Sequence, residues 1–258
     1  MEIFYTDLDN TMIYSYQHFI GADKRCVEVY RGREISFITE KTFELFNAIY
    51  QKINIVPVTT RTVEQYQRID FGTGGFRYAL TCNGGILLKD GCPDQNWYEE
   101  SLKMTEDARE EMQKATELLQ RDSNVMFEVR FIEKLFVFTK SNAPDKTAAM
   151  LQKHLDSTVA DVFTNGVKVY VVPKNLDKGT AVKRFSRQFH IGQSIAAGDS
   201  LFDLSMLQAA DEALCPEELA KYIVGKNPIV CKENELLSEK ALERVLSRIA
   251  KTGGRHFG

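Results

Sequence analysis

The side chains best suited to chemistry are two carboxylates and a hydroxyl near the start of the sequence. Residues 3–6 form a short apolar run that predicts a buried strand, and Asp7, Asp9 and Thr11 come directly after it. Residues i and i+2 of an extended backbone point the same way, so both carboxylates can converge on one point. Two like charges held that close need a proton or a cation between them, and Mg²⁺ suits oxygen ligands. Taken alone, the pattern also fits a surface turn with two solvated carboxylates.

Other polar residues stand at comparable places in the predicted elements. Thr59 follows an apolar run at 53–58, and Asp199 and Asp203 follow a later one. Lys178 begins a predicted helix. In a parallel sheet the carboxyl ends of the strands lie along one edge, where open α/β proteins bind their ligands. The sequence therefore predicts one site with carboxylates, a hydroxyl and an ammonium group.

This set of groups suits phosphoryl transfer. A carboxylate can attack phosphorus to form an aspartyl phosphate, while Mg²⁺ and a lysine offset charge on the transferred oxygens. A second carboxylate can then activate water for hydrolysis. A phospho-receiver module is the competing interpretation, because it also combines an acidic cluster, a hydroxyl and a lysine on a parallel sheet. Such modules are shorter, have no large insertion and lack an Asp two residues after the phosphorylated one.

The elements that must position these residues alternate between strands and helices at both ends of the chain. A β-hairpin is expected at 26–38, because alternating apolar residues flank a turn at 31–33, and a helix capped by Thr39 should follow at 42–50. Further elements are expected at 63–69, 77–82, 180–189, 194–197, 204–209, 229–231 and 236–250. This pattern predicts a Rossmann-like three-layer α/β core with a central, mostly parallel sheet, made from residues 1–85 and 174–258.

Residues 86–173 have a different pattern. Asn165 and Gly166 join two strand-like runs, which is the strongest hairpin signal of the chain. The other expected elements are strand-like runs at 86–89 and 96–98 around a turn, helices at 104–119 and 144–155, and strands at 125–131 and 135–139. Paired strands covered by helices predict an inserted α+β domain with an antiparallel sheet.

Composition and charge argue against several other classes of protein. The 258 residues are 43% hydrophobic and carry a formal net charge of −3, so no nucleic-acid partner is expected. No apolar run has the length of a membrane span and no signal peptide is recognisable, so we expect a cytoplasmic protein without a membrane partner. Five scattered cysteines favour reduced thiols over disulfides or zinc.

Four short motifs together resemble those of the haloacid dehalogenase (HAD) superfamily of phosphatases. They are Asp7-Leu-Asp9-Asn-Thr11, Thr59-Thr60-Arg61, Lys178 and Gly198-Asp199-Ser200-Leu-Phe-Asp203. The insertion lies between the second and third motifs. That position resembles the branch with an α/β cap in the second insertion position, which includes Cof-type and sucrose-phosphatase-like sugar phosphatases and phosphomannomutases.

The resemblance implies a role for each motif residue. Asp7 would be the nucleophile and a metal ligand, and Asp9 the general acid and base with its backbone carbonyl on the metal. Thr59, Thr60, Arg61 and Lys178 would bind the phosphoryl group or the rest of the substrate. Asp199 would bind the metal, Asp203 would be a ligand or a partner of one, and Thr11 would support the loop. Two residues depart from the pattern: Thr60 replaces a usual Gly, and Phe202 replaces an Asn frequent in Cof-type members.

The function expected from the resemblance is Mg²⁺-dependent hydrolysis of a small phosphorylated metabolite, with a sugar phosphate as one candidate. Substrate selection would belong to the inserted cap. A phosphomutase that uses the same aspartyl phosphate, and a non-catalytic phospho-binding or regulatory member, are the alternatives. A monomer or a homodimer is expected, and the role of the segment 21–38 is left open.

Overall fold

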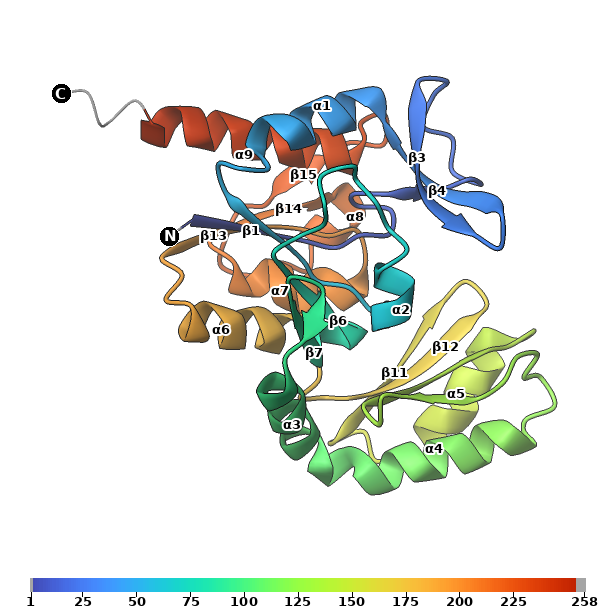
Figure 1. Ribbon diagram of the computed structural model, residues 1–258. Coiled ribbons are helices and arrows are strands. Elements are labelled where there is room, and N and C mark those ends of the chain that lie inside the picture. The colour runs from blue at the N-terminus through green and yellow to red at the C-terminus, as the bar shows by residue number, and fades with distance from the viewer. Residues whose placement is uncertain (1, 254–258) are drawn as a thin grey trace. The chain divides into compact units, whose positions relative to one another are not determined.

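A five-stranded parallel sheet forms the centre of the larger of two units in this computed structural model, which describes residues 2–253 (Figure 1). The larger unit contains the chain up to Pro93 and from Lys178 onward, and the smaller unit is Asp94–Asp177. The sequence placed the start of the insertion at residue 86. Residues 86–93 instead belong to the larger unit: the strand Ile86–Lys89 pairs with the preceding strand Tyr78–Thr81, and Cys92–Pro93 pairs with Ile86–Lys89.

The order of the parallel sheet is β15 (Ile229–Cys231), β14 (Glu212–Pro216), β13 (Gln193–Ala197), β1 (Glu2–Thr6) and β5 (Asn54–Pro57). β1 pairs with β13 on one side and with β5 on the other, in parallel register. Ile3, Phe4 and Tyr5 are accordingly buried, as expected for a strand covered on both faces. The predicted α/β class with a mostly parallel central sheet is confirmed.

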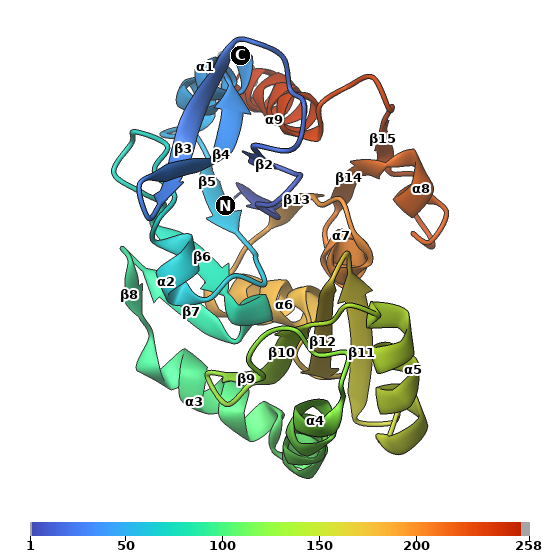
Figure 2. The same cartoon turned by 90° about the vertical axis from the view of Figure 1, so that its right-hand side faces the viewer.

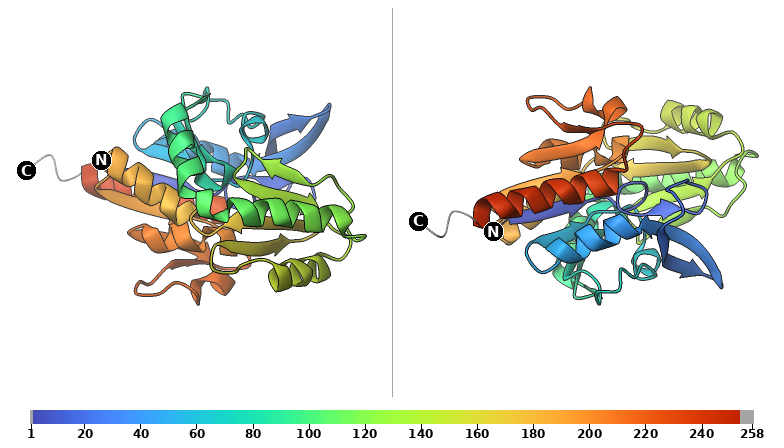
Figure 3. Two further views of the ribbon diagram at one scale, coloured as in Figure 1. Left: turned by 90° about the horizontal axis from the view of Figure 1, so that it is seen from below. Right: turned by 90° about the horizontal axis from the view of Figure 1, so that it is seen from above.

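Helices cover both faces of this sheet (Figures 1 and 3). α1 (Glu40–Ile49) and α9 (Leu237–Gly253) lie side by side on one face. α6 (Lys178–Gln188) and α7 (Leu204–Ala209) lie on the other face. Thr39 caps α1 as predicted, because its hydroxyl accepts the backbone N–H of Thr42 at 2.9 Å. Two one-turn helices complete this unit, α2 (Val63–Tyr66) and α8 (Glu217–Ala220).

Two small antiparallel sheets flank the parallel one. The predicted hairpin consists of β3 (Lys24–Tyr30) and β4 (Arg33–Thr39), and β2 (Tyr14–Ser15) pairs with β4 (Figure 2). The second small sheet contains β6 (Tyr78–Thr81), β7 (Ile86–Lys89) and β8 (Cys92–Pro93). β6 meets the end of β5 through a parallel bridge between Leu80 and Val58.

The smaller unit has a four-stranded antiparallel sheet, as predicted. Its strand order is β11 (Ala160–Asn165), β12 (Lys168–Pro173), β10 (Phe136–Lys140) and β9 (Arg130–Ile132). α4 (Arg109–Arg121) and α5 (Pro144–His154) pack against this sheet. Their contact with it is an apolar core that includes Met112, Leu119, Val137, Leu151 and Val169.

Three predicted elements of the smaller unit differ from the structure. Residues 96–98 belong to α3 (Gln95–Met104) and not to a strand, because Asp94 accepts the backbone N–H of Trp97 at 2.9 Å and caps the helix. The helix expected at 104–119 is two helices, since α3 ends at Met104 and α4 begins at Arg109. The strand expected at 125–131 is limited to β9, and the backbone carbonyl of Phe127 instead accepts the Thr139 hydroxyl at 2.9 Å.

Within residues 2–253, none of the helices combines the length and the apolar character that a membrane crossing requires.

Candidate active site

The carboxyl end of β1 places Asp7 at the edge of the parallel sheet. Its backbone N–H donates to the carbonyl of Ala197 at 2.9 Å, and the residue is only 7% exposed. The chain then turns sharply, with Asn10 at a φ of 57° and the N–H groups of Met12 and Ile13 both donating to Leu8. This closed turn holds Asp7 in place and directs the following residues away from the sheet.

Lys178 is a buried lysine that bridges two carboxylates. Its ammonium lies 2.5 Å from Oδ1 of Asp7 and 2.5 Å from Oδ1 of Asp203, and the residue is 1% exposed. Burial alone would lower the pKa of Lys178, but the charges of Asp203 and Asp7 outweigh it, so the pKa is raised and the ammonium persists. The first residue of α6 therefore supplies a fixed positive charge beside Asp7.

A close helix contact fixes the position of Lys178. A side chain at Gly179 would place its Cβ 2.4 Å from the backbone oxygen of Ser205 in α7, which only glycine avoids. The N–H of Gly179 donates to the Ser205 hydroxyl at 2.9 Å. The beginnings of α6 and α7 are therefore held together at the site.

Asp203 organises the loop that follows β13. Its Oδ2 accepts the backbone N–H of Asp199 at 3.1 Å, together with the N–H and the hydroxyl of Ser200, each at 2.9 Å. A Cβ at Gly198 would lie 2.3 Å from the Cβ of Asp203, so the loop must pass Asp203 without a side chain there. Both carboxylate oxygens of Asp203 are therefore engaged by donors.

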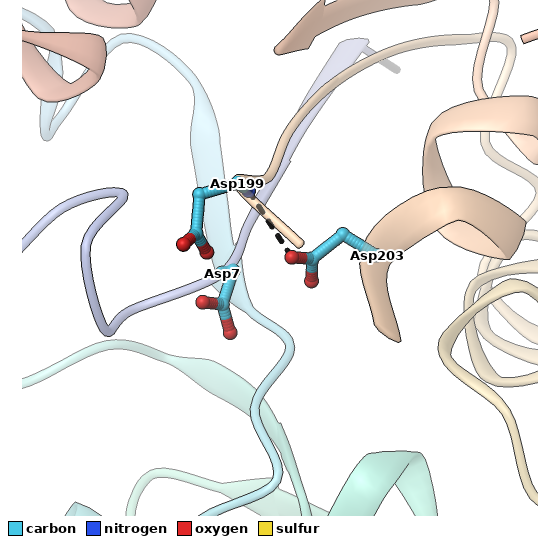
Figure 4. A group of neighbouring side chains, drawn as sticks. All are labelled: Asp7, Asp199 and Asp203. Carbon is cyan, nitrogen blue, oxygen red and sulfur yellow. Dashed lines mark hydrogen bonds between the residues drawn. The ribbon is translucent and has the colours of Figure 1, made fainter. Parts of the chain in front are cut away.

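Asp7, Asp199 and Asp203 gather at one point (Figure 4), where each offers a carboxylate oxygen within 4.8 Å of the others. The Thr11 hydroxyl donates to Asp199 at 3.4 Å, so Thr11 supports this arrangement. Burial raises the pKa of Asp7 well above its usual range, and the neighbouring carboxylates add to the effect while Lys178 opposes it. Burial and the charge of Asp203 raise the pKa of Asp199 to about 7. Three carboxylates with one ammonium leave an excess of negative charge, which a divalent cation would balance.

The second motif lies in the loop after β5, in the same unit. Thr59 is fully buried, its N–H donates to the carbonyl of Leu80 at 2.8 Å, and its hydroxyl accepts the N–H of Arg61 at 3.1 Å. Thr60 is half-buried beside it. The backbone of this loop is therefore fixed against the strand β6.

Arg61 forms a second ionic group together with Asp9. Its Nε and Nη2 donate to the two oxygens of Asp9 at 2.8 and 2.7 Å, and its Nη1 lies 2.9 Å from Oε2 of Glu28. Burial would lower the pKa of Arg61, but the contacts with Asp9 and Glu28 raise it, so the guanidinium stays charged. The predicted substrate contact of Arg61 stays a prediction, since its guanidinium holds two carboxylates here.

Sequence reasoning missed Glu28. It belongs to a hairpin whose charged residues suggested a solvated surface, and regular alternation with Val27 and Val29 would place it on the outward face. In the structure Val27 and Glu28 are buried while Val29 is 53% exposed, so the alternation of residue types carried no signal for an inward Glu28.

Comparison with known proteins relates the chain to a family. The family model of haloacid dehalogenase-like hydrolases matches residues 92–235, which is more than half of the chain. The matched range includes Lys178, Asp199 and Asp203, while Asp7 and Asp9 precede it. No curated protein matches the sequence at a significant level.

Solved structures of low sequence identity share the fold. Sucrose-phosphatase from Synechocystis sp. PCC6803, solved with sucrose and phosphate, aligns over 96% of this chain and 97% of its own, with a TM-score of 0.64 and 15% identity. The haloacid dehalogenase-like hydrolase yhjK from Bacillus subtilis aligns over 96% and 91%, with a TM-score of 0.56 and 16% identity. A sugar phosphatase of HAD subclass IIB aligns over 97% and 99%, with a TM-score of 0.55 and 14% identity. The motifs, the fold and the family match agree: this chain belongs to the haloacid dehalogenase-like hydrolase family.

Proposed function

We propose that this protein is a Mg²⁺-dependent phosphatase that hydrolyses a small phosphomonoester through an aspartyl phosphate on Asp7. One observation carries the proposal: the buried ammonium of Lys178 bridges Asp7 and Asp203 at the edge of a parallel sheet, beside Asp199. A carboxylate nucleophile next to a fixed positive charge is what transfer of a phosphoryl group requires.

The carboxylates fit a Mg²⁺ ion. Hard oxygen donors are its preferred ligands, and the excess negative charge of the cluster favours a divalent cation. We propose that Asp7, Asp199 and the backbone carbonyl of Asp9 hold the ion. Asp203, assigned to the metal from the resemblance, would contribute by holding Lys178 and the loop, because donors already engage both of its oxygens. Mg²⁺ would supply positive charge that offsets the negative charge of the phosphoryl oxygens.

The proposed steps use residues of the larger unit. Asp7 attacks phosphorus and forms the phosphorus–oxygen bond of an aspartyl phosphate, while the bond to the leaving oxygen breaks and Asp9 gives that oxygen a proton. Asp9 then takes a proton from water, whose oxygen attacks phosphorus and releases phosphate and the Asp7 carboxylate. Lys178 and Thr59 would bind the phosphoryl oxygens, and Thr60 and Arg61 would contact the substrate around them.

The substrate class proposed is a small phosphorylated metabolite, with sugar phosphates as the first candidates. The names of similar structures support this choice, since they include a sucrose-phosphatase and a sugar phosphatase. The inserted unit, Asp94–Asp177, is proposed as the cap that selects among substrates.

A screen of phosphorylated metabolites tests the proposal, with released phosphate as the readout and with Mg²⁺ or a chelator present. We expect hydrolysis that requires Mg²⁺ and that falls to background in Asp7→Asn, whose side chain has the same shape but no nucleophilic charge. Hydrolysis that survives excess chelator or the Asp7→Asn substitution would contradict the mechanism. An isomeric sugar phosphate in place of free phosphate would identify a phosphomutase instead.

A further inference from the structure

We propose that Glu28 of β3 is a positioning residue for this reaction, holding Arg61 and, through Arg61, fixing the orientation of the Asp9 carboxylate. The inference rests on the proposed function, in which Asp9 transfers protons. It also gives the hairpin of β3 and β4 a role in the site.

Glu28 is a buried carboxylate with a complete set of donors. The residue is 1% exposed. Its Oε2 lies 2.9 Å from Nη1 of Arg61 and accepts the Ser36 hydroxyl at 2.6 Å, while its Oε1 accepts Nε of Arg68 at 3.0 Å. Donors therefore fix both oxygens of the carboxylate, and its position determines where the Arg61 guanidinium can lie.

An irregularity in the hairpin turns Glu28 inward. The register between β3 and β4 shifts on both sides of Glu28, and Val27 and Glu28 are both buried although they are neighbours in the strand. Successive side chains of a regular strand point to opposite faces, whereas a bulge can redirect one of them. The local backbone thus delivers a carboxylate to Arg61 that a regular strand would place elsewhere.

Arg61 transmits this position to Asp9. Its side chain is 13% exposed and its backbone N–H is fixed by the Thr59 hydroxyl. The Asp9 side chain is 51% exposed, and its two oxygens accept the two parallel donors of Arg61. Arg61 therefore holds the Asp9 carboxylate in one orientation, and proton transfer depends on orientation.

Stability alone does not account for this cluster. Taking charges out of water is costly, and well-packed apolar residues of similar volume are often as stabilising as a buried ion pair. The contact with Asp9 gives the buried charges a function that apolar residues could not supply. Two consecutive ion pairs, Glu28–Arg61 and Arg61–Asp9, thereby connect the hairpin to the loop that follows β1.

The test compares Glu28→Gln with two control variants. Arg68→Gln removes another ion pair of Glu28 without touching Asp9, and Glu34→Gln removes an exposed carboxylate from the same hairpin. Each variant is assayed with an alkyl phosphate, whose poor leaving group needs a proton, and with an activated aryl phosphate, which needs little protonation. Glu28→Asp, which keeps the charge, serves as the rescue variant.

We expect Glu28→Gln to lower kcat for the alkyl phosphate by about tenfold or more, with KM within about twofold and a much smaller loss for the aryl phosphate. Glu28→Asp should recover part of the loss. Arg68→Gln, which leaves the contact between Glu28 Oε2 and Arg61 in place, should lower the melting temperature and change the ratio of the two rates less than Glu28→Gln does, and Glu34→Gln should resemble the wild type. Equal losses with both substrates, a change in KM alone, or a ratio change in Glu34→Gln as large as that in Glu28→Gln would overturn the proposal.

Two further measurements guard against an unfolded variant and against a wrong functional proposal. If Glu28→Gln does not fold, the double variant Glu28→Gln/Arg68→Gln takes its place, because it also removes the Arg68 charge that has lost its partner. The ratio of the alkyl phosphate rate to the aryl phosphate rate should then fall as expected for Glu28→Gln alone. A crystal structure of the folded variant tests positioning without any assay. It should show Arg61 and Asp9 displaced from their paired geometry, and an unchanged pair would overturn the proposal even if the phosphatase activity were established.

Discussion

Lys178 shows how a buried charge depends on its partners. Its ammonium is almost inaccessible to solvent, yet it remains charged because two carboxylates lie 2.5 Å away. A buried charge that loses its partner is strongly destabilising, and the same holds for the carboxylates that Lys178 neutralises. The residue is therefore important both for the fold near the site and for the proposed chemistry.

Lys178→Met should remove activity while keeping most of the side-chain volume. We expect kcat for any phosphomonoester to fall by about 10²-fold or more, because no fixed positive charge then opposes the phosphoryl oxygens. Steady-state kinetics and circular dichroism check this, with Lys183→Met as the control, since Lys183 is an exposed lysine of the same helix. A Lys178→Met protein with nearly normal kcat would show that Lys178 does not contact the transferred group.

In the metal-free protein, Asp199 should make the folded state less favourable as the pH rises from about 4 to about 7. The pKa of Asp199 is raised to about 7 by burial and by Asp203, whereas in the unfolded chain it has its ordinary value. Between these values the folded state binds more protons than the unfolded state, so its free energy of unfolding falls as the pH rises. The raised pKa of Asp7 acts in the same direction.

Denaturant unfolding in chelator across this pH range measures the effect. Asp199→Asn should make the pH dependence shallower, and Mg²⁺ should restore stability at the higher pH by balancing the ionised carboxylates. A pH dependence in chelator that Asp199→Asn leaves unchanged would contradict the raised pKa of Asp199.

The sequence predicted that Asp7, Lys178, Asp199 and Asp203 would lie together, but it did not predict the buried position of Glu28. Asp7, Lys178 and Asp199 lie in short motifs at the ends of elements, and a parallel sheet brings such ends together whatever the details of packing. The position of Glu28 depends on a register shift between β3 and β4. Tertiary contacts decide which residues of an irregular strand point inward. A periodic sequence pattern does not record those contacts.

At the scale of elements, the close contact between α6 and α7 determines where Lys178 lies. Glycine is required at position 179 because a Cβ would lie 2.4 Å from the backbone oxygen of Ser205. A backbone atom in a helix cannot move aside as a flexible side chain can. A substitution here should therefore shift the start of α6 and the ammonium with it.

Gly179→Ala should lower the melting temperature and also reduce kcat, although residue 179 itself carries no reacting group. Replacing an exposed residue of the same helix, as in Lys183→Ala, should change neither by much. Thermal unfolding and steady-state kinetics together check the two effects. A Gly179→Ala protein with normal stability and normal kcat would mean that α6 does not need this close approach.

Elements with strong local signals were predicted well, whereas those without them were not. The apolar run of β1, the cap of α1 and the hairpin turn between β11 and β12 are local features that the sequence displays. Residues 96–98 were expected to pair with 86–89 because the two runs flank a turn, but the cap at Asp94 and the burial of Trp97 favour α3. The run at 125–131 has apolar residues typical of a strand, but only its last two residues lie in β9, and none of its residues is buried.

In the molecule as a whole, the acidic cluster belongs entirely to the larger unit and the inserted residues form the smaller one. The chain enters that unit after Pro93 and leaves it before Lys178, and Asp7, Asp199 and Asp203 all belong to the larger unit. We therefore propose that the larger unit performs the chemistry and that the inserted unit selects the substrate.

Replacing residues 95–176 with a short Gly/Ser linker should leave this chemistry in place. We expect a folded core that hydrolyses a small activated aryl phosphate weakly and only with Mg²⁺, and whose preference among metabolite phosphates is much flatter. The same core with Asp7→Asn is the control. A folded core that keeps the wild-type order of substrates would show that selection resides in the larger unit, with the hairpin of β3 and β4 as the next element to examine.

Transfer of phosphate to Asp7 can be observed directly by trapping the phosphoenzyme. Asp9→Asn should still accept phosphate from an activated aryl phosphate but hydrolyse the aspartyl phosphate slowly, because the base for water is missing. Rapid quenching of this variant with labelled substrate and Mg²⁺, followed by peptide mapping, should place the label on the peptide that contains Asp7. No label should be found there when Asp7→Asn is added to the same variant. Label on another peptide, or label that persists in the double variant, would contradict the claim.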